Sequence, residues 1–76
     1  MRLVSYDGLF DVLYDNVMLF VEERGEAYAI RAYITENTPA PIMGVYETRK
    51  RTFQVLGVLR GKYGLMDVSV FYFPQE

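Results

Sequence analysis

The sequence predicts an α+β fold: a mostly antiparallel, meandering sheet of five to six strands with one helix, at about residues 48–63, before the last strand. Three observations predict this class. Only residues 48–63 show a clear helical period, short apolar runs elsewhere have the length of strands, and turn-forming residues separate those runs. The chain has 76 residues, which predicts a single small domain over residues 1–76.

The helix is expected to begin at Thr48, whose hydroxyl can accept a hydrogen bond from a free N–H of the first turn. Side chains suited to a core then recur at steps of three and four and share one helical face: Thr52, Val55, Leu56, Leu59 and Tyr63. Gly57 lies in the middle of this helix and should lower its stability by about 1 kcal/mol relative to Ala. Residues 53–59 alone would also suit a strand, but the longer period favours a helix.

The first three strands are expected at residues 2–6, 9–14 and 17–23. Asp7-Gly8 is a strong tight-turn signal, so the first two strands should form a hairpin. Asp15-Asn16 marks the next turn. The third strand contains V-M-L-F-V, a run that is apolar on both faces and is typical of a central strand.

Three further strands are expected, at residues 27–35, 42–46 and 68–73. The connection over residues 36–41 is expected to be a loop, because Pro39 and Pro41 lack the N–H group that a central strand needs for its ladder. The last strand should stop at Pro74 for the same reason.

A sheet of this size predicts self-association. Five or six strands spaced about 4.8 Å apart span roughly 24 Å, whereas a helix is only about 10 Å across. One helix therefore leaves apolar sheet surface uncovered, unless the sheet curls into a partial barrel. We expect a homo-oligomer, most simply a two-fold dimer, whose contact surface uses aromatic side chains of the sheet: Tyr28, Tyr33, Phe71 and Phe73.

Basic side chains open the predicted helix, where the helix macrodipole prefers anions. Arg49, Lys50 and Arg51 lie in its first turn, and Arg60 lies near its end. One interpretation is a solvated basic turn with no function. The other is a contact site for an anion or an acidic partner, because free N–H groups and cations would point the same way.

Nucleic-acid binding is the alternative function that these cations allow. Arg49, Lys50, Arg51 and Arg60 would contact phosphates, while exposed Tyr28, Tyr33 and Tyr72 beside Arg31 would stack on single-stranded bases. The net charge of −2 argues against non-specific binding by the whole surface. The other interpretation is that these tyrosines fill the core and the interface of a small sheet, where the hydroxyl group stays hydrated.

The composition excludes several kinds of catalytic and metal site. The chain contains no Cys and no His, which removes disulfides, zinc fingers, thiol nucleophiles and Ser-His-Asp triads. Asp7, Asp11 and Asp15 recur every four residues and would share a face on a helix, where they could hold Mg²⁺ or Ca²⁺. They fall instead in a turn, a strand and a turn, so we expect no metal site. The sequence contains no phosphate-binding loop or catalytic motif, so we also expect no cofactor and no enzyme activity.

No stretch approaches the roughly 20 apolar residues needed to span a bilayer. The opening M-R-L-V-S-Y-D-G contains no apolar signal region. A soluble cytoplasmic protein without a membrane partner is therefore expected.

Short motifs are similar to those of small uncharacterised proteins of Gram-positive bacteria and their prophages. The opening V-S-Y-D-G-L-F-D-V-L-Y, residues 4–14, resembles the family pattern S-x-D-G-x-x-D-V-x-Y. Y-E-T-R-K-R-T at residues 46–52 resembles its helix start, L-R-G-K-Y at residues 59–63 its helix end, and F-Y-F-P at residues 71–74 its closing strand. Leu13 replaces a usual Pro, and Arg49 and Lys50 replace usual acids.

This resemblance implies the strand-helix-strand order and implies no activity. The expected function is therefore a small non-enzymatic interaction module that self-associates through an apolar sheet face. The alternative is a nucleic-acid-binding accessory or regulatory protein of a mobile element that uses the basic start of the helix.

Overall fold

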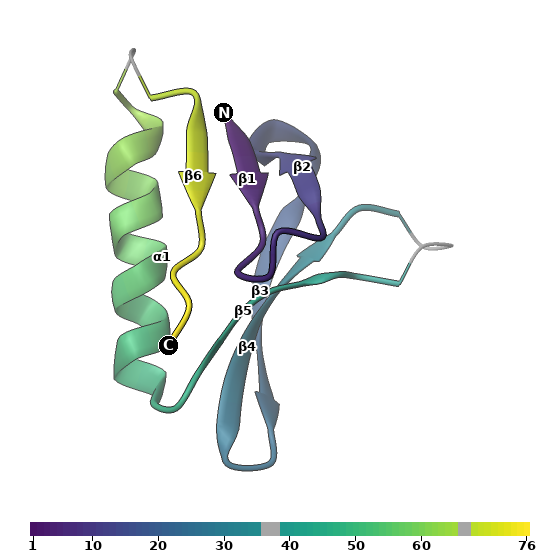
Figure 1. Ribbon diagram of the computed structural model, residues 1–76, viewed down its shortest axis with the longest axis vertical. Helices are drawn as coiled ribbons and strands as arrows, with labels where there is room; N and C mark the ends of the chain where they lie inside the picture. The colour runs from purple at the N-terminus through teal and green to yellow at the C-terminus, as the bar shows by residue number, and fades with distance from the viewer. Residues whose placement is uncertain (36–38, 66–67) are drawn as a thin grey trace.

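The computed structural model describes residues 1–35, 39–65 and 68–76 (Figure 1). Residues 36–38 of the expected loop lie outside these ranges. The elements follow in the order β1 (Arg2–Val4), β2 (Asp11–Leu13), the short 3₁₀ helix η1 (Tyr14–Asn16), β3 (Met18–Arg24), β4 (Ala27–Tyr33), β5 (Ile42–Tyr46), α1 (Arg49–Tyr63) and β6 (Val70–Tyr72). The predicted α+β class with a single helix before the last strand is confirmed for the described residues.

The strands form two three-stranded sheets, so the prediction of one continuous meandering sheet is wrong. One sheet has the order β2-β1-β6, and the other has the order β3-β4-β5. The pairs β1–β2, β3–β4 and β4–β5 are antiparallel, whereas β1 and β6 pair in parallel. Figure 1 shows β6 lying beside β1, between it and α1. Because the strands are divided between two sheets, each sheet is narrower than the single sheet that was expected.

The turn between β1 and β2 is built around the side chains of Ser5 and Asp7. The Ser5 hydroxyl donates to Asp7 Oδ1 at 2.6 Å and accepts from the Phe10 N–H at 3.0 Å. Asp7 Oδ1 also accepts from the Leu9 N–H at 3.1 Å. Gly8 has a φ of +76°, a left-handed conformation that favours glycine. The S-Y-D-G motif therefore has a structural role, and the predicted hairpin is confirmed.

The β3-β4-β5 sheet places alternate residues of β4 on opposite faces. Ile30 and Ala32 face α1 and belong to the core, whereas Arg31 and Tyr33 lie on the opposite, outer face. A register shift between Ile30 and Arg31 interrupts the pairing of β4 with β5. The Tyr6 N–H donates to the Met43 carbonyl oxygen at 2.8 Å, which links the β1–β2 turn to β5.

Helix α1 follows the predicted cap and core face. Thr48 has extended backbone angles, and its hydroxyl accepts a hydrogen bond from the Arg51 N–H at 3.1 Å. The buried residues of the helix are four of the five expected: Thr52, Val55, Leu56 and Leu59. Tyr63 is the exception, with 45% of its surface exposed. In the described part of the chain, no helix combines the length and the apolar character needed to cross a membrane.

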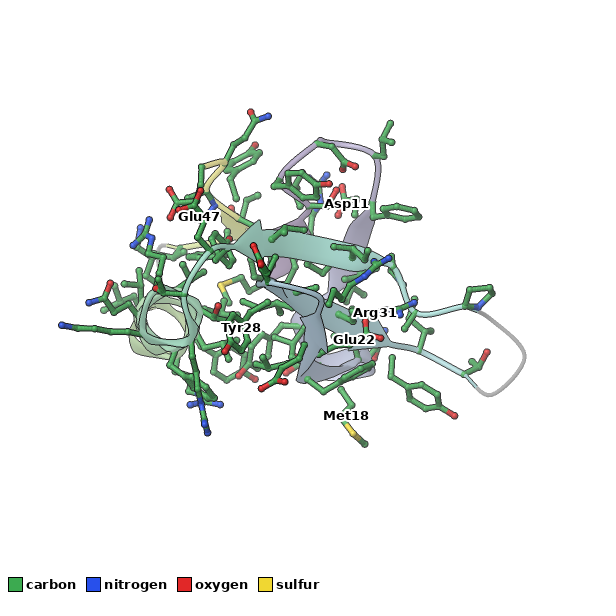
Figure 2. The ribbon with its side chains drawn as sticks, turned by 90° about the horizontal axis from the view of Figure 1, so that it is seen from below. Asp11, Met18, Glu22, Tyr28, Arg31 and Glu47 are labelled. Atoms are coloured by element: carbon green, nitrogen blue, oxygen red, sulfur yellow. The ribbon has the colours of Figure 1, made fainter. Side chains whose placement is uncertain are left out.

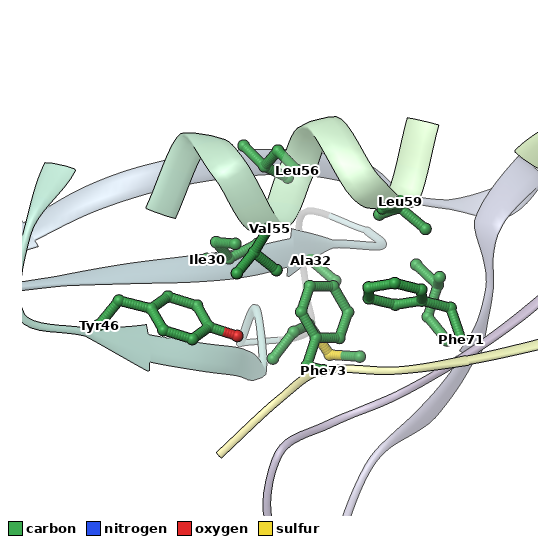
Figure 3. Packing of buried hydrophobic residues seen from close by; sticks show 10 residues of the cluster. Ile30, Ala32, Tyr46, Val55, Leu56, Leu59, Phe71 and Phe73 are labelled. Atoms are coloured by element: carbon green, nitrogen blue, oxygen red, sulfur yellow. The ribbon is translucent and has the colours of Figure 1, made fainter. Parts of the chain in front are cut away.

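Within the described residues, one hydrophobic cluster joins the helix to both sheets. Figure 3 shows Val55 pointing from α1 toward Ile30 on β4, with the ring of Phe73 close by. Phe71 and Phe73 meet edge to face with ring centroids 5.1 Å apart. Their side chains are only 5% and 3% exposed, so they belong to the core of this chain and not to an open sheet face.

Candidate functional site

The basic side chains at the start of α1 point in different directions. The Arg49 guanidinium lies over the ring of Phe53, with its carbon 5.4 Å from the ring centroid. The Arg51 side chain forms an ion pair with Glu76. Lys50 is exposed and has no ion pair with the described residues. The three basic residues in the first turn of α1 therefore do not form one cluster.

The helical repeat explains this division. At about 100° per residue, Arg49 and Arg60 fall on one side of α1. Arg51 and Lys62 fall on the opposite side, and Lys50 points between them into solvent. Arg60 also lies about 16 Å along the axis from Arg49. The structure therefore does not gather the four predicted cations, Arg49, Lys50, Arg51 and Arg60, into one patch.

Two separate hollows lie along the side of α1 that carries Arg49 and Arg60, and together we call them the first groove. The hollow near the start of the helix has a volume of about 230 Å³ and is lined by Val21, Glu23, Tyr28, Arg49 and Phe53. The hollow near the end has a volume of about 180 Å³ and is lined by Tyr14, Val17, Leu19, Leu56, Leu59 and Arg60. Both parts combine apolar walls with one arginine.

A second groove follows the other side of α1, between the helix and β6. Its central part has a volume of about 220 Å³ and is lined by Arg51, Val55, Val58, Lys62, Phe71, Tyr72 and Pro74. We call this part the α1–β6 groove. At the start of the helix it adjoins a hollow of about 320 Å³ lined by Glu47, Thr48, Arg51 and Glu76. Val58 and Lys62 were not among the predicted site residues, although their spacing from Arg51 places all three on one side of the helix.

Tyr14, which lines the hollow near the end of α1, stacks on Tyr63 of the helix. Their rings stack with centroids 4.3 Å apart and an interplanar angle of 29°. The Tyr63 hydroxyl donates to the Asp15 carboxylate. This hydrogen bond and the charge of Asp15 raise the pKa of Tyr63 above its ordinary value. The contact attaches the end of α1 to η1 and supplies no acid or base that functions near neutral pH.

The aromatic residues predicted for self-association do not share a surface. Tyr28 lies on the face of β4 that is directed toward α1, where it lines the first groove (Figure 2). Tyr33 lies on the outer face, opposite Met18 of β3. Phe71 and Phe73 are buried in the core. Of the four residues, only Tyr33 lies on an uncovered sheet face.

The outer face of the β3-β4-β5 sheet carries exposed apolar side chains that sequence analysis missed. Met18 and Phe20 are 64% and 38% exposed. Figure 2 shows Met18 pointing outward from the sheet, with Glu22 and Arg31 side by side on the same sheet. An alternation count along β3 would have placed Met18, Phe20 and Glu22 together, because strand residues two apart share a face.

An ion pair occupies the middle of this outer face. Arg31 Nη1 donates to Glu22 Oε2 at 3.0 Å, and Arg31 Nε and Nη2 donate to the Ala40 carbonyl oxygen at 3.0 and 2.6 Å. Arg31 is thereby bonded through three nitrogens. The sheet face is apolar at the Met18 end and polar, but satisfied, at its centre.

The three aspartates considered as metal ligands serve separate structural roles. Asp7 holds the β1–β2 turn, Asp11 forms an ion pair with Arg2, and Asp15 accepts from Tyr63. In residues 1–35, 39–65 and 68–76, no cluster of three ligating side chains could hold a metal ion.

No protein family model, curated protein or solved structure matches this chain.

Proposed function

We propose that this chain is a small non-enzymatic interaction module that forms a homodimer through the outer face of its β3-β4-β5 sheet. The observation that carries the proposal is the pair of exposed apolar side chains on β3, Met18 and Phe20, beside Tyr33 of β4. Apolar surface gathered on one sheet face is typical of a protein–protein contact.

The shape of the chain supports an uncovered face. Its accessible surface is 5186 Å², whereas a compact monomer of this mass would expose about 4800 Å². The Cα atoms span 37 × 30 × 18 Å, so the body is flat. Two flat bodies that stack face to face would bury this excess accessible surface.

The central ion pair is compatible with burial between two copies. Burying a charge is costly mainly when its partner is missing. Arg31 and Glu22 are already paired with each other, and the Ala40 carbonyl occupies two further donors of Arg31. Around a two-fold axis each copy presents the same face to the other, so the Arg31–Glu22 pair is buried on both sides of the contact in the same way.

Light scattering across a dilution series tests the dimer. We expect twice the 8.9 kDa chain mass, falling toward 8.9 kDa on dilution. The double change Met18→Lys and Phe20→Lys should give a monomer at every concentration. Leu9→Lys is the matched control, because Leu9 is 77% exposed on a different part of the surface. A wild-type mass of one chain throughout, or equal dissociation by Leu9→Lys, would contradict the proposal.

Nucleic-acid binding through the start of α1 is a second candidate. One observation favours it: the first turn contains no acidic side chain to neutralise Arg49 and Lys50. Titration with a single-stranded oligonucleotide at low salt tests it. Binding should weaken when Arg49, Lys50 and Arg51 are changed together to Ala, and unchanged affinity in that variant would exclude this site.

A further inference from the structure

The α1–β6 groove combines an apolar floor with an open strand edge. Val55 and Phe71 are 2% and 5% exposed and form its base, while Val58 and Tyr72 are 50% and 69% exposed and form its sides. β6 is the last strand of its sheet, with β1 as its only neighbour there. The groove therefore runs along the edge of β6 that pairs with no other strand of the described residues.

The hydrogen bonds between β1 and β6 define which backbone groups remain open. The Arg2 N–H donates to the Ser69 carbonyl oxygen at 2.8 Å, and the Phe73 N–H donates to the Val4 carbonyl oxygen at 3.0 Å. Strand residues two apart direct their backbone groups to the same side. Residues 69, 71 and 73 thus face β1, and Val70 and Tyr72 face away from it. Neither of these two forms a backbone bond with the described residues.

Two cations mark the ends of the groove. Arg51 and Lys62 are separated by about 16 Å along the helix, a distance that about five residues of an extended chain would span. Arg51 already binds the carboxylate of Glu76, which shows that this end accepts an acidic side chain. Lys62 has no ion pair with the described residues, so its charge remains open to a partner.

We propose that the α1–β6 groove binds an extended, acidic segment of a partner protein, which adds as a strand beside β6. Backbone groups of that segment pair with Val70 and Tyr72. Its apolar side chains lie on the groove floor, and its carboxylates meet Lys62 and, in place of Glu76, Arg51. This site is separate from the outer face of the β3-β4-β5 sheet and does not depend on dimer formation.

Fluorescence anisotropy with a labelled, capped peptide of sequence Glu-Val-Thr-Val-Thr-Glu tests the proposal. Binding should be saturable, and a peptide with Lys at both ends should bind at least about tenfold more weakly, because like charges then meet at both ends. Lys62→Glu should lower the affinity for the acidic peptide by about tenfold. Lys50→Glu is the matched control, since it makes the same charge change on the solvent side of α1.

Two changes at Tyr72 separate backbone pairing from simple charge attraction. Tyr72→Pro removes an N–H that β1 does not use, so it should abolish binding without removing a bond from the sheet. Tyr72→Ala removes one side wall of the groove and keeps the N–H, so it should weaken binding much less than Tyr72→Pro does. Circular dichroism checks that both variants are folded, and amide resonances of Val70 and Tyr72 should shift on peptide addition in the unchanged protein.

Several results would overturn the proposal. These are equal binding of the acidic and basic peptides, equal loss in Lys50→Glu and Lys62→Glu, or the absence of saturation. Binding of a single-stranded oligonucleotide that depends on Lys62 but not on the Tyr72 N–H would also overturn it, because the groove would then recognise phosphate and not a strand.

Discussion

The hydroxyl group of Tyr46 donates a hydrogen bond to the carbonyl oxygen of Pro74 at 3.1 Å, and this bond joins β5 to the segment that follows β6. Tyr46 is 1% exposed and belongs to the hydrophobic cluster. The contact therefore connects the two sheets through a buried polar group.

Tyr46→Phe should lower the free energy of unfolding by about 1 kcal/mol, because the Pro74 carbonyl oxygen loses its donor. Urea denaturation measures this change. Tyr33→Phe is the control, since Tyr33 lies opposite Met18 on the outer sheet face and outside the hydrophobic cluster. Equal loss in the two variants would show that the Tyr46 bond contributes nothing specific.

Stability should also fall at high pH through Tyr46. Burial and the charge of Glu76 raise the pKa of Tyr46 from 10.0 to about 12, although Arg51 opposes the shift. The unfolded chain therefore releases this proton first, and the stabilisation present below pH 10 is lost as pH rises toward 12. Tyr46→Phe should flatten this part of the stability profile. An unchanged slope between the two proteins would contradict the assignment.

Gly44→Ala should destabilise the chain by about 2 kcal/mol through overpacking. A Cβ at this buried position would lie 2.8 Å from Cε2 and Cζ of the Tyr46 ring. The ring is held by its own packing and by the bond to Pro74, so it cannot move aside cheaply. Thermal unfolding measures the effect, and an unchanged transition would show that the ring relaxes freely.

Gly57→Ala should have the opposite effect. Gly57 lies on the exposed side of α1, and a Cβ there would meet nothing within 4 Å. Ala should stabilise the helix by up to about 1 kcal/mol, because it loses less backbone entropy than Gly on folding. The same thermal unfolding experiment checks this prediction, and a loss of stability would indicate that Gly57 is needed for another reason.

Asp7 should make the free energy of unfolding depend on pH in the acid range. The hydrogen bond from Ser5, followed by that from the Leu9 N–H, lowers the pKa of Asp7 below its ordinary value of 3.8. Its contribution is therefore complete above that value and is lost as pH falls through the lowered pKa. Asp7→Asn should remove this part of the acid dependence. Asp11, whose pKa Arg2 lowers, provides a second and separate part.

The elements that depend on local sequence could be predicted. The cap at Thr48 and the period of three and four define α1, and Asp7-Gly8 defines the first turn, because each acts through neighbours in the chain. The division into two sheets could not be predicted in this way. It depends on the parallel pairing of Leu3 with Phe71, two residues from opposite ends of the chain.

The candidate surfaces were predictable only in part. Alternation shows that Phe71 and Phe73 lie on one face of a strand, but not whether that face meets the same chain or another copy. They meet α1 and β1 of the same chain, so they belong to the core. By contrast, the separation of Arg49 from Arg51 followed directly from the helical repeat, and the sequence contained the information needed to see it.

The parallel pairing of β1 with β6 also has a consequence for how the chain folds. The sheet β3-β4-β5 joins strands that follow one another, so it can form as soon as those residues are present. β1 can pair with β2 early, but its pairing with β6 closes a long loop between Leu3 and Phe71, which is entropically costly. During synthesis, the buried side chain of Leu3 therefore lacks its Phe71 neighbour until residue 71 has left the ribosome. We expect the β2-β1-β6 sheet to be completed after the β3-β4-β5 sheet.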